Sequence, residues 1–194
     1  MSSHHFVKEG QEPALFILDN IGFQYAESLL EWVPIVIVAD HALESVLQWG
    51  IKIDIVLQHG YSFDALEHLA KDQGPVQILR CSNDDVVAQG LQFAIKEGYD
   101  AVNLLGRPRE ELFREVENSA RELQVGIYSV QEKWSLISCG KFEKWMQAGS
   151  VFLFKSTSAV QTEGVIQKDE YWETGAAGMV MVRSETKFWI GEPR

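Results

Sequence analysis

The segment between residues 35 and 60 constrains the fold of this chain more than any other stretch. An unbroken apolar run, residues 35–39, ends at Asp40, and a second apolar run covers residues 53–57 with a single acidic interruption. Between them lie apolar side chains at helical spacing. Continuous runs of β-branched residues bounded by turn signals are typical of strands buried on both faces of a parallel sheet. The segment therefore predicts a β-α-β unit. Asp40 and the turn at residues 58–62 would lie at the carboxyl ends of its strands, where open α/β sheets bind ligands.

The same alternation of apolar runs and amphipathic segments continues on both sides of this unit. We expect further strands at residues 14–18, 76–79, 101–105 and 125–130, and helices at residues 23–32, after Asp64, after Ser82 or Asn83, and from Pro108 to about Leu123. Asp64 followed by Glu67 resembles a capping box, and proline is favoured at the start of a helix. Strands that alternate with single helices indicate a parallel, Rossmann-like sheet with helices on both faces.

After about residue 131 the pattern changes to short β-rich segments separated by Gly, Ser and Thr. Strands are expected at residues 134–138, 151–155, 158–161, 179–183 and 188–190, and only residues 141–147 have a pattern that suggests a helical turn. Short strands without intervening helices indicate an antiparallel sheet or sandwich. We therefore predict an α/β fold in two domains: an α/β domain at residues 1–132 and a small β-sandwich-like domain at residues 133–194.

Net charge and apolar patterning exclude several classes of partner. The chain carries 28 acidic and 17 basic residues, a net charge of −11, whereas nucleic-acid binding draws most of its affinity from basic contacts to phosphates. The same surplus opposes nucleotide phosphates unless a cation or a basic cluster reverses the local field. No apolar run approaches the ~20 residues of a membrane span. Cys81 and Cys139 form no metal pattern and fit a reducing compartment. We expect a cytoplasmic protein that binds neither nucleic acid nor membrane.

Several stretches together resemble thiamine pyrophosphokinase. They are VADHALESVLQWGIKIDIVL, GLQFAIKEGYDAVNLLG and the TEG at residues 162–164. The resemblance implies an α/β nucleotide-binding domain followed by a β-sandwich domain. It also implies a homodimer with thiamine sites at the subunit interface. Members of this family transfer a pyrophosphoryl group from ATP to thiamine with the help of magnesium.

The family's first two motifs are altered here. The first, Asp-Gly-Gly or Asp-Gly-Ala, reads Asp40-His41-Ala42, so a histidine replaces a glycine that lets backbone approach a ligand. The second, Gly-Asp-x-Asp-Ser, reads Gln-His-Gly-Tyr-Ser and keeps only Ser62. Both carboxylates of that motif are missing, and neither histidine nor tyrosine replaces them as a ligand for a hard cation.

The later motifs depart from the family as well. The third, a Thr-Asp pair before a Leu-x-Lys-Ala helix, aligns Asp85 with the threonine and Val86 with the aspartate, while Asp84 and Asp85 lie one or two residues early. The fourth, Arg-x-Asp-His, is replaced by residues 107–111. The Ser-Asn pair that binds thiamine in the family is replaced within residues 174–177.

These observations give a set of crevice candidates but assign no catalytic residue and no metal ligand. The candidates are Asp40, His41, His59, Ser62, Asp84 and Asp85. Asp40 has two interpretations, a ligand-binding residue or the cap of the following helix. The two histidines are interpreted as catalytic bases or as exposed turn residues, and the two later aspartates as metal ligands or as caps.

Three functions remain open. The first is a catalytically silent relative of thiamine pyrophosphokinase, which dimerises and keeps a small-molecule site, for thiamine or a nucleotide, or an interaction role. The second is an active enzyme that uses Mg²⁺ and ATP and rebuilds its metal site from Asp40, Asp64, Asp84 and Asp85. The third is a purely structural or interaction homodimer, which predicts an exposed apolar or aromatic patch.

Overall fold

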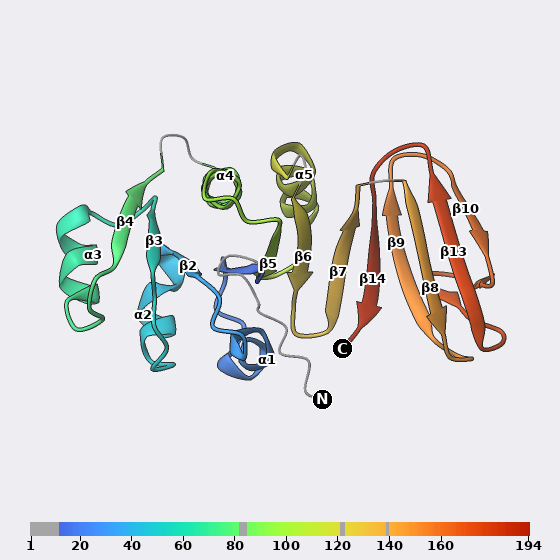
Figure 1. Cartoon of the computed structure of the whole chain (residues 1–194), viewed down its shortest axis with the longest axis horizontal. Coiled ribbons are helices and arrows are strands. Elements are labelled where there is room, and N and C mark those ends of the chain that lie inside the picture. The colour runs from blue at the N-terminus through green and yellow to red at the C-terminus, as the bar shows by residue number, and fades with distance from the viewer. Residues whose placement is uncertain (1–11, 82–84, 121–122, 139) are drawn as a thin grey trace, which may run out of the picture.

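Six parallel strands form the first half of a large sheet in the computed structural model, which describes residues 12–81, 85–120, 123–138 and 140–194 (Figure 1). The strands are β1 (Ala14–Ile17), β2 (Val36–Ala39), β3 (Ile55–Gln58), β4 (Gln77–Arg80), β5 (Ala101–Leu105) and β6 (Gln124–Tyr128). They are ordered β6-β5-β1-β2-β3-β4. The chain moves outward from β1 to β4 and then crosses back, so the order reverses between β1 and β5.

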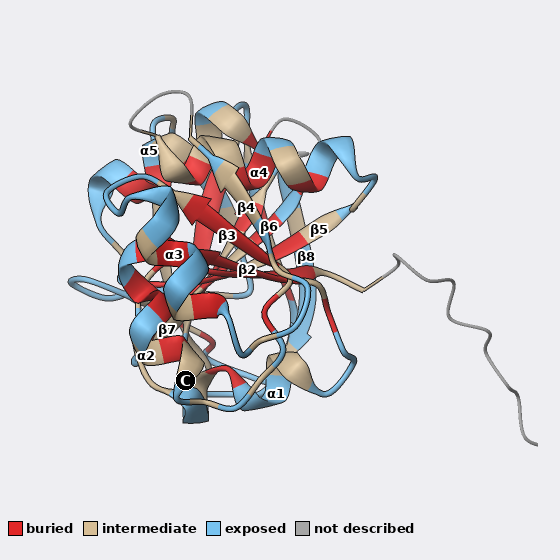
Figure 2. Ribbon diagram, turned by 90° about the vertical axis from the view of Figure 1, so that its left-hand side faces the viewer, coloured by how far each residue is buried: buried red, intermediate tan, exposed pale blue. Residues whose placement is uncertain are grey.

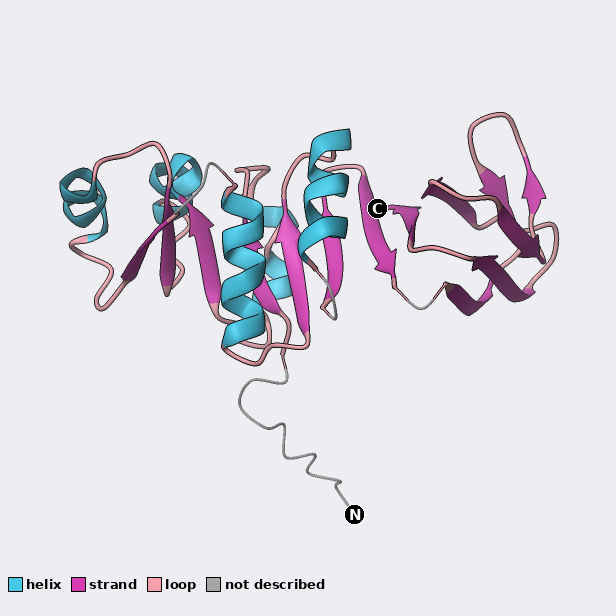
Figure 3. Cartoon of the chain, turned by 90° about the horizontal axis from the view of Figure 1, so that it is seen from above, coloured by secondary structure: helices cyan, strands magenta, loops and turns pink. Residues whose placement is uncertain are grey.

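Helices cover both faces of these strands (Figure 3). Their bounds are η1 (Phe23–Tyr25), α1 (Glu27–Leu30), η2 (Asp40–Ala42), α2 (Leu43–Leu47), α3 (Phe63–Ala70), α4 (Val86–Lys96) and α5 (Glu110–Ser119). The first three α-helices contribute to one apolar core, and α4 and α5 contribute to the other. The parallel strands at the centre are therefore buried on both sides, as the apolar runs predict (Figure 2).

Strand β1 shows how one short run serves both cores. Ala14 and Phe16 belong to the core under α4 and α5, whereas Leu15 and Ile17 belong to the opposite core. Helix α4 approaches the sheet closely at Gly90, where an added Cβ would lie 2.5 Å from the ring of Phe16. A glycine inside this helix is thus explained by the packing of the ring against the backbone.

The rest of the chain is antiparallel and β-rich. Its strands are β7 (Glu132–Ile137), β8 (Lys141–Met146), β9 (Val151–Ser156), β10 (Val160–Glu163), β11 (Ile166–Gln167), β12 (Trp172–Glu173), β13 (Gly178–Ser184) and β14 (Phe188–Pro193). The large sheet continues from β6 through β7, β14, β9 and β12 to β11, and a second sheet has the order β10-β13-β8. Phe152, Val182 and Phe188 form an apolar core shared by strands of both sheets.

This architecture confirms the coarse prediction of an α/β fold that begins with a parallel sheet and ends in a β-rich region. The division at residue 132 stays a prediction, since the pairing of β6 with β7 carries one sheet across that position. None of the helices in the described ranges is long and apolar enough to cross a membrane.

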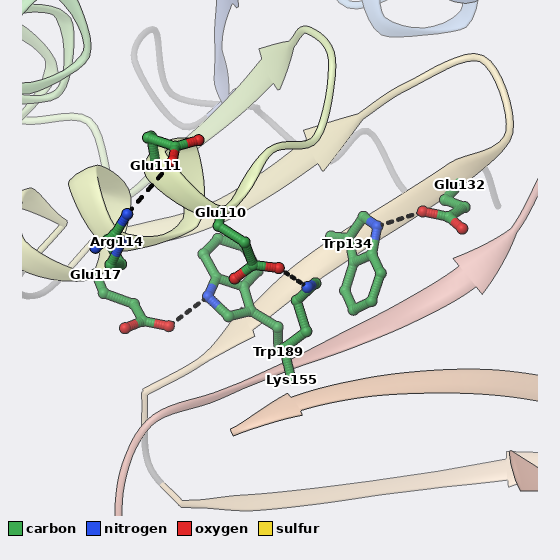
Figure 4. Close-up of polar contacts among 8 residues, drawn as sticks. All are labelled: Glu110, Glu111, Arg114, Glu117, Glu132, Trp134, Lys155 and Trp189. Atoms are coloured by element: carbon green, nitrogen blue, oxygen red, sulfur yellow. Dashed lines mark hydrogen bonds and ion pairs between the residues drawn. The ribbon is translucent and has the colours of Figure 1, made fainter. Parts of the chain in front are cut away.

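Aromatic side chains join α5 to the β-rich region (Figure 4). The indole Nε1 of Trp189 donates to Glu117 Oε1 at 2.7 Å, and Lys155 forms an ion pair with Glu110. The ring of Phe113 meets Trp134 and Trp189 edge to face, with centroids 5.2 and 5.0 Å away. Both tryptophans are buried, so they serve as core residues between the two parts of the chain.

The structure corrects four local predictions. The segment at residues 141–147 is not helical, because it forms strand β8, which pairs with β13 along its whole length. The expected helix at residues 23–32 consists of two short pieces, η1 and α1. Helix α3 is capped by Ser62, whose Oγ accepts from Ala65 N at 3.3 Å, rather than by Asp64. Helix α5 ends at Ser119.

Candidate functional site

A cavity of about 310 Å³ opens at the carboxyl ends of β1, β2 and β3, beside the first turn of α4 and one face of α5. Its lining residues are Leu18, Asp40, His41, His59, Gly60, Asp85, Val86, Val87, Arg109 and Glu115. Four of the six crevice candidates from the sequence thus meet around one cavity. We call it the carboxyl-edge cavity.

Asp40 fixes the turn that follows β3. Its carboxylate is 2% exposed, and Oδ2 accepts from the backbone amides of His59, Gly60 and Tyr61 at 2.7, 2.6 and 2.9 Å. Burial alone would raise the pKa of Asp40, but these amide donors outweigh it and lower the pKa. The interpretation of Asp40 as a helix cap is wrong, because it is the first residue of η2 and its side chain caps no helix.

His41 lies between two carboxylates. Its Nε2 is 3.7 Å from Asp19 Oδ1, and its Nδ1 is 3.9 Å from Asp40 Oδ1. Only the imidazolium form has a proton on both ring nitrogens and can serve both acids. The carboxylate of Asp19 is the main reason that the pKa of His41 is raised above its ordinary value, against the partial burial of the ring.

Asp19 joins the loops that follow β1 and β5. Its Oδ2 accepts from the backbone amide of Arg107 at 2.9 Å and lies 3.4 Å from Arg109 Nη1. Burial raises the pKa of Asp19, while His41 and the two arginine contacts lower it more. The loop ends of β5, β1, β2 and β3 are therefore connected in that order by Arg109, Asp19, His41 and Asp40.

The sequence reasoning missed Asp19, although it had a signal. Asp19 follows the first apolar run in the same way that Asp40 follows the second. Because the carboxyl ends of parallel strands share one edge, the two acids are expected to be neighbours when their strands are. β1 and β2 do pair directly, with Ile17 opposite Val38. Their pairing is what brings the two carboxylates to His41.

Two acids on the helices face the cavity from the other side. Asp85 caps α4, since its Oδ1 accepts from Ala88 N at 2.8 Å, as one interpretation of this residue predicted. Glu115 on α5 is partly buried, and that burial is the first reason that its pKa is raised. The nearby charge of Asp85 raises the pKa of Glu115 further.

The remaining candidates are placed differently. His59 lines the cavity and donates its backbone amide to Asp40, while Ser62 serves as the cap of α3 and does not line the cavity. Asp84 lies outside the described residues, as do Ser82 and Asn83. Asp64 lies in α3 and is not part of the cavity lining. Within the described ranges, no group of three or more His, Cys, Asp or Glu side chains is arranged to hold a metal ion.

Comparison with known proteins gives structural likeness only. No protein-family model matches the sequence, and no curated protein matches it significantly. Thiamin pyrophosphokinase from Geobacillus thermodenitrificans matches the structure with a TM-score of 0.71 at 10% identity, over 93% of this chain and 97% of that one. The Candida albicans enzyme has a TM-score of 0.68 at 11% identity, over 93% and 89% of the two chains. The Bacillus subtilis enzyme has a TM-score of 0.67 at 9% identity, over 93% and 98%.

These matches confirm the resemblance seen in the sequence at the level of fold. The chain has the fold of thiamine pyrophosphokinases over 93% of its length in each of these three matches, which includes most of the β-rich region. At these identities the likeness says nothing of activity.

Proposed function

We propose that this chain is a thiamine pyrophosphokinase-like protein that no longer transfers pyrophosphate and that binds a small molecule at the carboxyl-edge cavity. The contacts of Asp40 carry the proposal. Phosphoryl transfer is catalysed by positioning and by neutralisation of charge on the phosphates, for which Mg²⁺ is held through carboxylates, phosphates and water. Asp40 is the acid retained from the family's first motif. Its carboxylate accepts hydrogen bonds from the turn after β3, and we infer that it stabilises this turn instead of binding a metal.

The donor set around the cavity does not fit Mg²⁺. Oδ2 of Asp40 accepts three amides, and Oδ1 faces His41. Asp85 caps a helix through Oδ1, and Glu115 is a partly buried residue of α5. A hard cation prefers several ionised or neutral oxygen ligands at once. The residues described at this edge supply no such cluster.

The backbone of the turn after β3 is also unavailable to a phosphate. Successive backbone amides in a turn form a concave site that binds anions. Here the amides of His59, Gly60 and Tyr61 all point at the carboxylate of Asp40. The carboxylate of Asp40 thus takes the amide donors that the phosphate of a bound ligand would need. This supports a ligand other than a nucleotide in the carboxyl-edge cavity.

The assembly and location that we propose rest on the resemblance rather than on the cavity. We propose a cytoplasmic homodimer. The exposed side chains of Trp145 and Met179, which are 56% and 58% exposed and opposite each other on β8 and β13, are apolar surface of the kind an interaction role requires. Size measurement in solution tests the dimer directly.

Ligand titration by calorimetry and by thermal shift tests the proposed function. The ligands are thiamine, thiamine diphosphate, ATP and AMP, each with and without Mg²⁺. A ligand that binds only the folded state raises its apparent stability. We expect no stabilisation by ATP that depends on Mg²⁺ and no conversion of thiamine. A response to thiamine or its diphosphate alone identifies a sensor or carrier.

The active-enzyme alternative makes the opposite prediction. Magnesium-dependent stabilisation by ATP together with turnover of thiamine would refute the proposed loss of transfer. In that case Asp40→Asn should abolish turnover. The matched control is Asp72→Asn, which removes the same charge from an exposed position outside the cavity.

A further inference from the structure

A second and larger cavity lies where the strand order reverses. It has a volume of about 560 Å³, within the range of small-molecule sites. Its lining residues are Asn20, Ile21, Gly22, Arg107, Pro108, Ser129, Val130, Gln131 and Glu132. These residues follow β1 and β5, form the turn between β6 and β7, or begin β7. We call it the switch-point cavity.

Its position follows from the topology. After β1 the chain turns to α1 on one face of the sheet, and after β5 it turns to α5 on the opposite face. Loops that leave neighbouring strands in opposite directions open a crevice between them, and open α/β sheets bind ligands there. The carboxyl-edge cavity lies beside this point, outside β1, β2 and β3.

The walls of the switch-point cavity are held by hydrogen bonds. Asn20 Oδ1 accepts from Gly22 N at 3.0 Å, where a φ of 108° suits glycine. Asp19 accepts the amide of Arg107 at 2.9 Å. The hydroxyl of Ser129 donates to Glu132 O at 3.0 Å and accepts from Glu132 N at 3.0 Å. Such walls require little reordering when a ligand binds.

Arg194 stabilises the turn between β6 and β7. Its Nη1 donates to Ser129 O at 3.1 Å, and its guanidinium carbon lies 5.4 Å from the centre of the Tyr128 ring. These contacts engage the guanidinium of Arg194. It therefore supports the turn at Ser129 and is not one of the lining residues.

The lining residues combine an apolar surface with one available cation. Ile21, Pro108 and Val130 are apolar, and Val130 is 46% exposed. The carboxylate of Glu132 accepts from Trp134 Nε1 at 2.7 Å. No acidic side chain of the described residues is ion-paired with the exposed Arg107. A guanidinium beside an apolar wall suits a planar anionic group on an apolar body.

We infer that the switch-point cavity binds a small molecule with an apolar body and one carboxylate or phosphate group, and that Arg107 contacts the anionic group. The inference does not depend on the proposed function, because it uses none of the residues that line the carboxyl-edge cavity. Carboxylate and phosphate share the recognition chemistry, so the experiment includes both.

Calorimetry with four probes that share a benzene ring tests the inference. The probes are benzoate, phenyl phosphate, benzyl alcohol and benzylamine. We expect at least one of the two anions to bind the full chain with millimolar affinity or better, and the alcohol and the amine to bind at least about tenfold more weakly. Amide NMR shifts on titration should be concentrated in residues 20–22, Arg107 and residues 129–132.

Three variants distinguish binding at the switch-point cavity from non-specific electrostatic binding of the anion. Arg107→Gln should weaken binding of the anion at least about tenfold, which is the scale of one charge-assisted contact. Arg114→Gln removes the same charge from α5, where Glu111 is the one acidic partner of Arg114 among the described residues, and should leave binding unchanged. Val130→Trp should block binding by filling the cavity while preserving charge.

Four results would overturn the inference. They are failure of both anions to bind the wild-type chain, equal binding by benzylamine, unchanged affinity in Arg107→Gln, or shifts confined to the carboxyl-edge cavity. Loss of fold does not complicate the result, because Arg107 is exposed and its contact with Asp19 is made by the backbone. Far-ultraviolet circular dichroism of each variant checks this.

Discussion

Two adjacent residues, Asp40 and His41, connect loops that are distant in sequence. Asp40 reaches 19 to 21 residues along the chain to the turn after β3. His41 faces Asp19 at the end of β1 as well as Asp40. Both contacts are polar and lie at the rim of the parallel sheet. The conformation of the loops at this rim therefore depends on a few charged side chains rather than on apolar packing.

Asp40→Asn should lower the free energy of unfolding by about 1–3 kcal/mol, because a neutral amide oxygen is a weaker acceptor than a carboxylate for three backbone amides. The pKa of Asp40 is lowered in the folded state, so its contribution is present above the ordinary value of 3.8 and is lost as the pH falls through the lowered pKa. Urea denaturation at several pH values measures the difference. A constant difference down to strongly acidic pH would contradict this account, and Asp72→Asn is the control.

His41 should have the opposite pH dependence. Its pKa is raised, chiefly by Asp19, so the stabilisation is fully present below the ordinary value of 6.5 and is lost as the pH rises through the raised pKa. The side chain is 53% exposed, so the effect should be below about 1 kcal/mol and should decrease with salt. NMR titration of the imidazole should give a pKa above 6.5, which Asp19→Asn lowers. An unchanged titration in that variant would exclude Asp19 as the cause.

The sequence could place these acids but not identify their partners. A carboxylate after a buried strand is predicted to lie at the carboxyl edge, and Asp40 does. Three backbone amides are its partners because of the backbone path of the turn after β3. The side chains of that turn do not predict this path. The contacts among Asp19, His41 and Arg109 depend on the strand order, which local periodicity does not encode.

The prediction of elements succeeded where the signal was local. The buried parallel strands were visible as apolar runs, and each lies within about two residues of its predicted place. Strand β8 was not visible in this way, because residues 141–146 are a mixture of charged and aromatic residues without a clear period. The strand conformation of this segment is set by its pairing with β13. Tertiary contacts override weak local preference in such segments.

The cap of α3 distinguishes two interpretations of one short stretch. Ser62→Ala should lower the free energy of unfolding by about 1 kcal/mol, because it removes the acceptor for Ala65 N. Asp64→Ala should cost less, since Asp64 lies in the first turn of α3, where an acidic side chain interacts favourably with the helix dipole. Thermal unfolding of the two variants compares them directly. A larger effect of Asp64→Ala would restore the capping box predicted from the sequence.

The large 11-stranded sheet connects the parallel region to the β-rich region. β14 at the C-terminal end lies between β7 and β9, and β7 pairs with β6 of the parallel region. The same region is fixed from one face by α5, through the contacts of Trp189 and Lys155. The two predicted domains therefore share backbone pairing as well as a side-chain interface.

This arrangement predicts a single unfolding transition. Tryptophan fluorescence reports the interface, where Trp134 and Trp189 are buried, together with the four other tryptophans of the chain. Far-ultraviolet circular dichroism reports all the elements. Coincident denaturation curves indicate two-state unfolding. Glu117→Ala should lower the free energy of unfolding by about 1–3 kcal/mol, because it leaves the buried indole Nε1 of Trp189 without its acceptor. It should shift both curves together.

Glu111→Ala is the matched control, since it removes a 63% exposed carboxylate of the same helix that forms an ion pair with Arg114. It should change stability by less than about 0.5 kcal/mol. If the boundary at residue 132 separated two units that unfold independently, Glu117→Ala would instead split the transition into two. The fluorescence curve would then move to lower denaturant while part of the dichroism signal stayed in place. That outcome would mean that the pairing of β6 with β7 contributes little to the stability of either part.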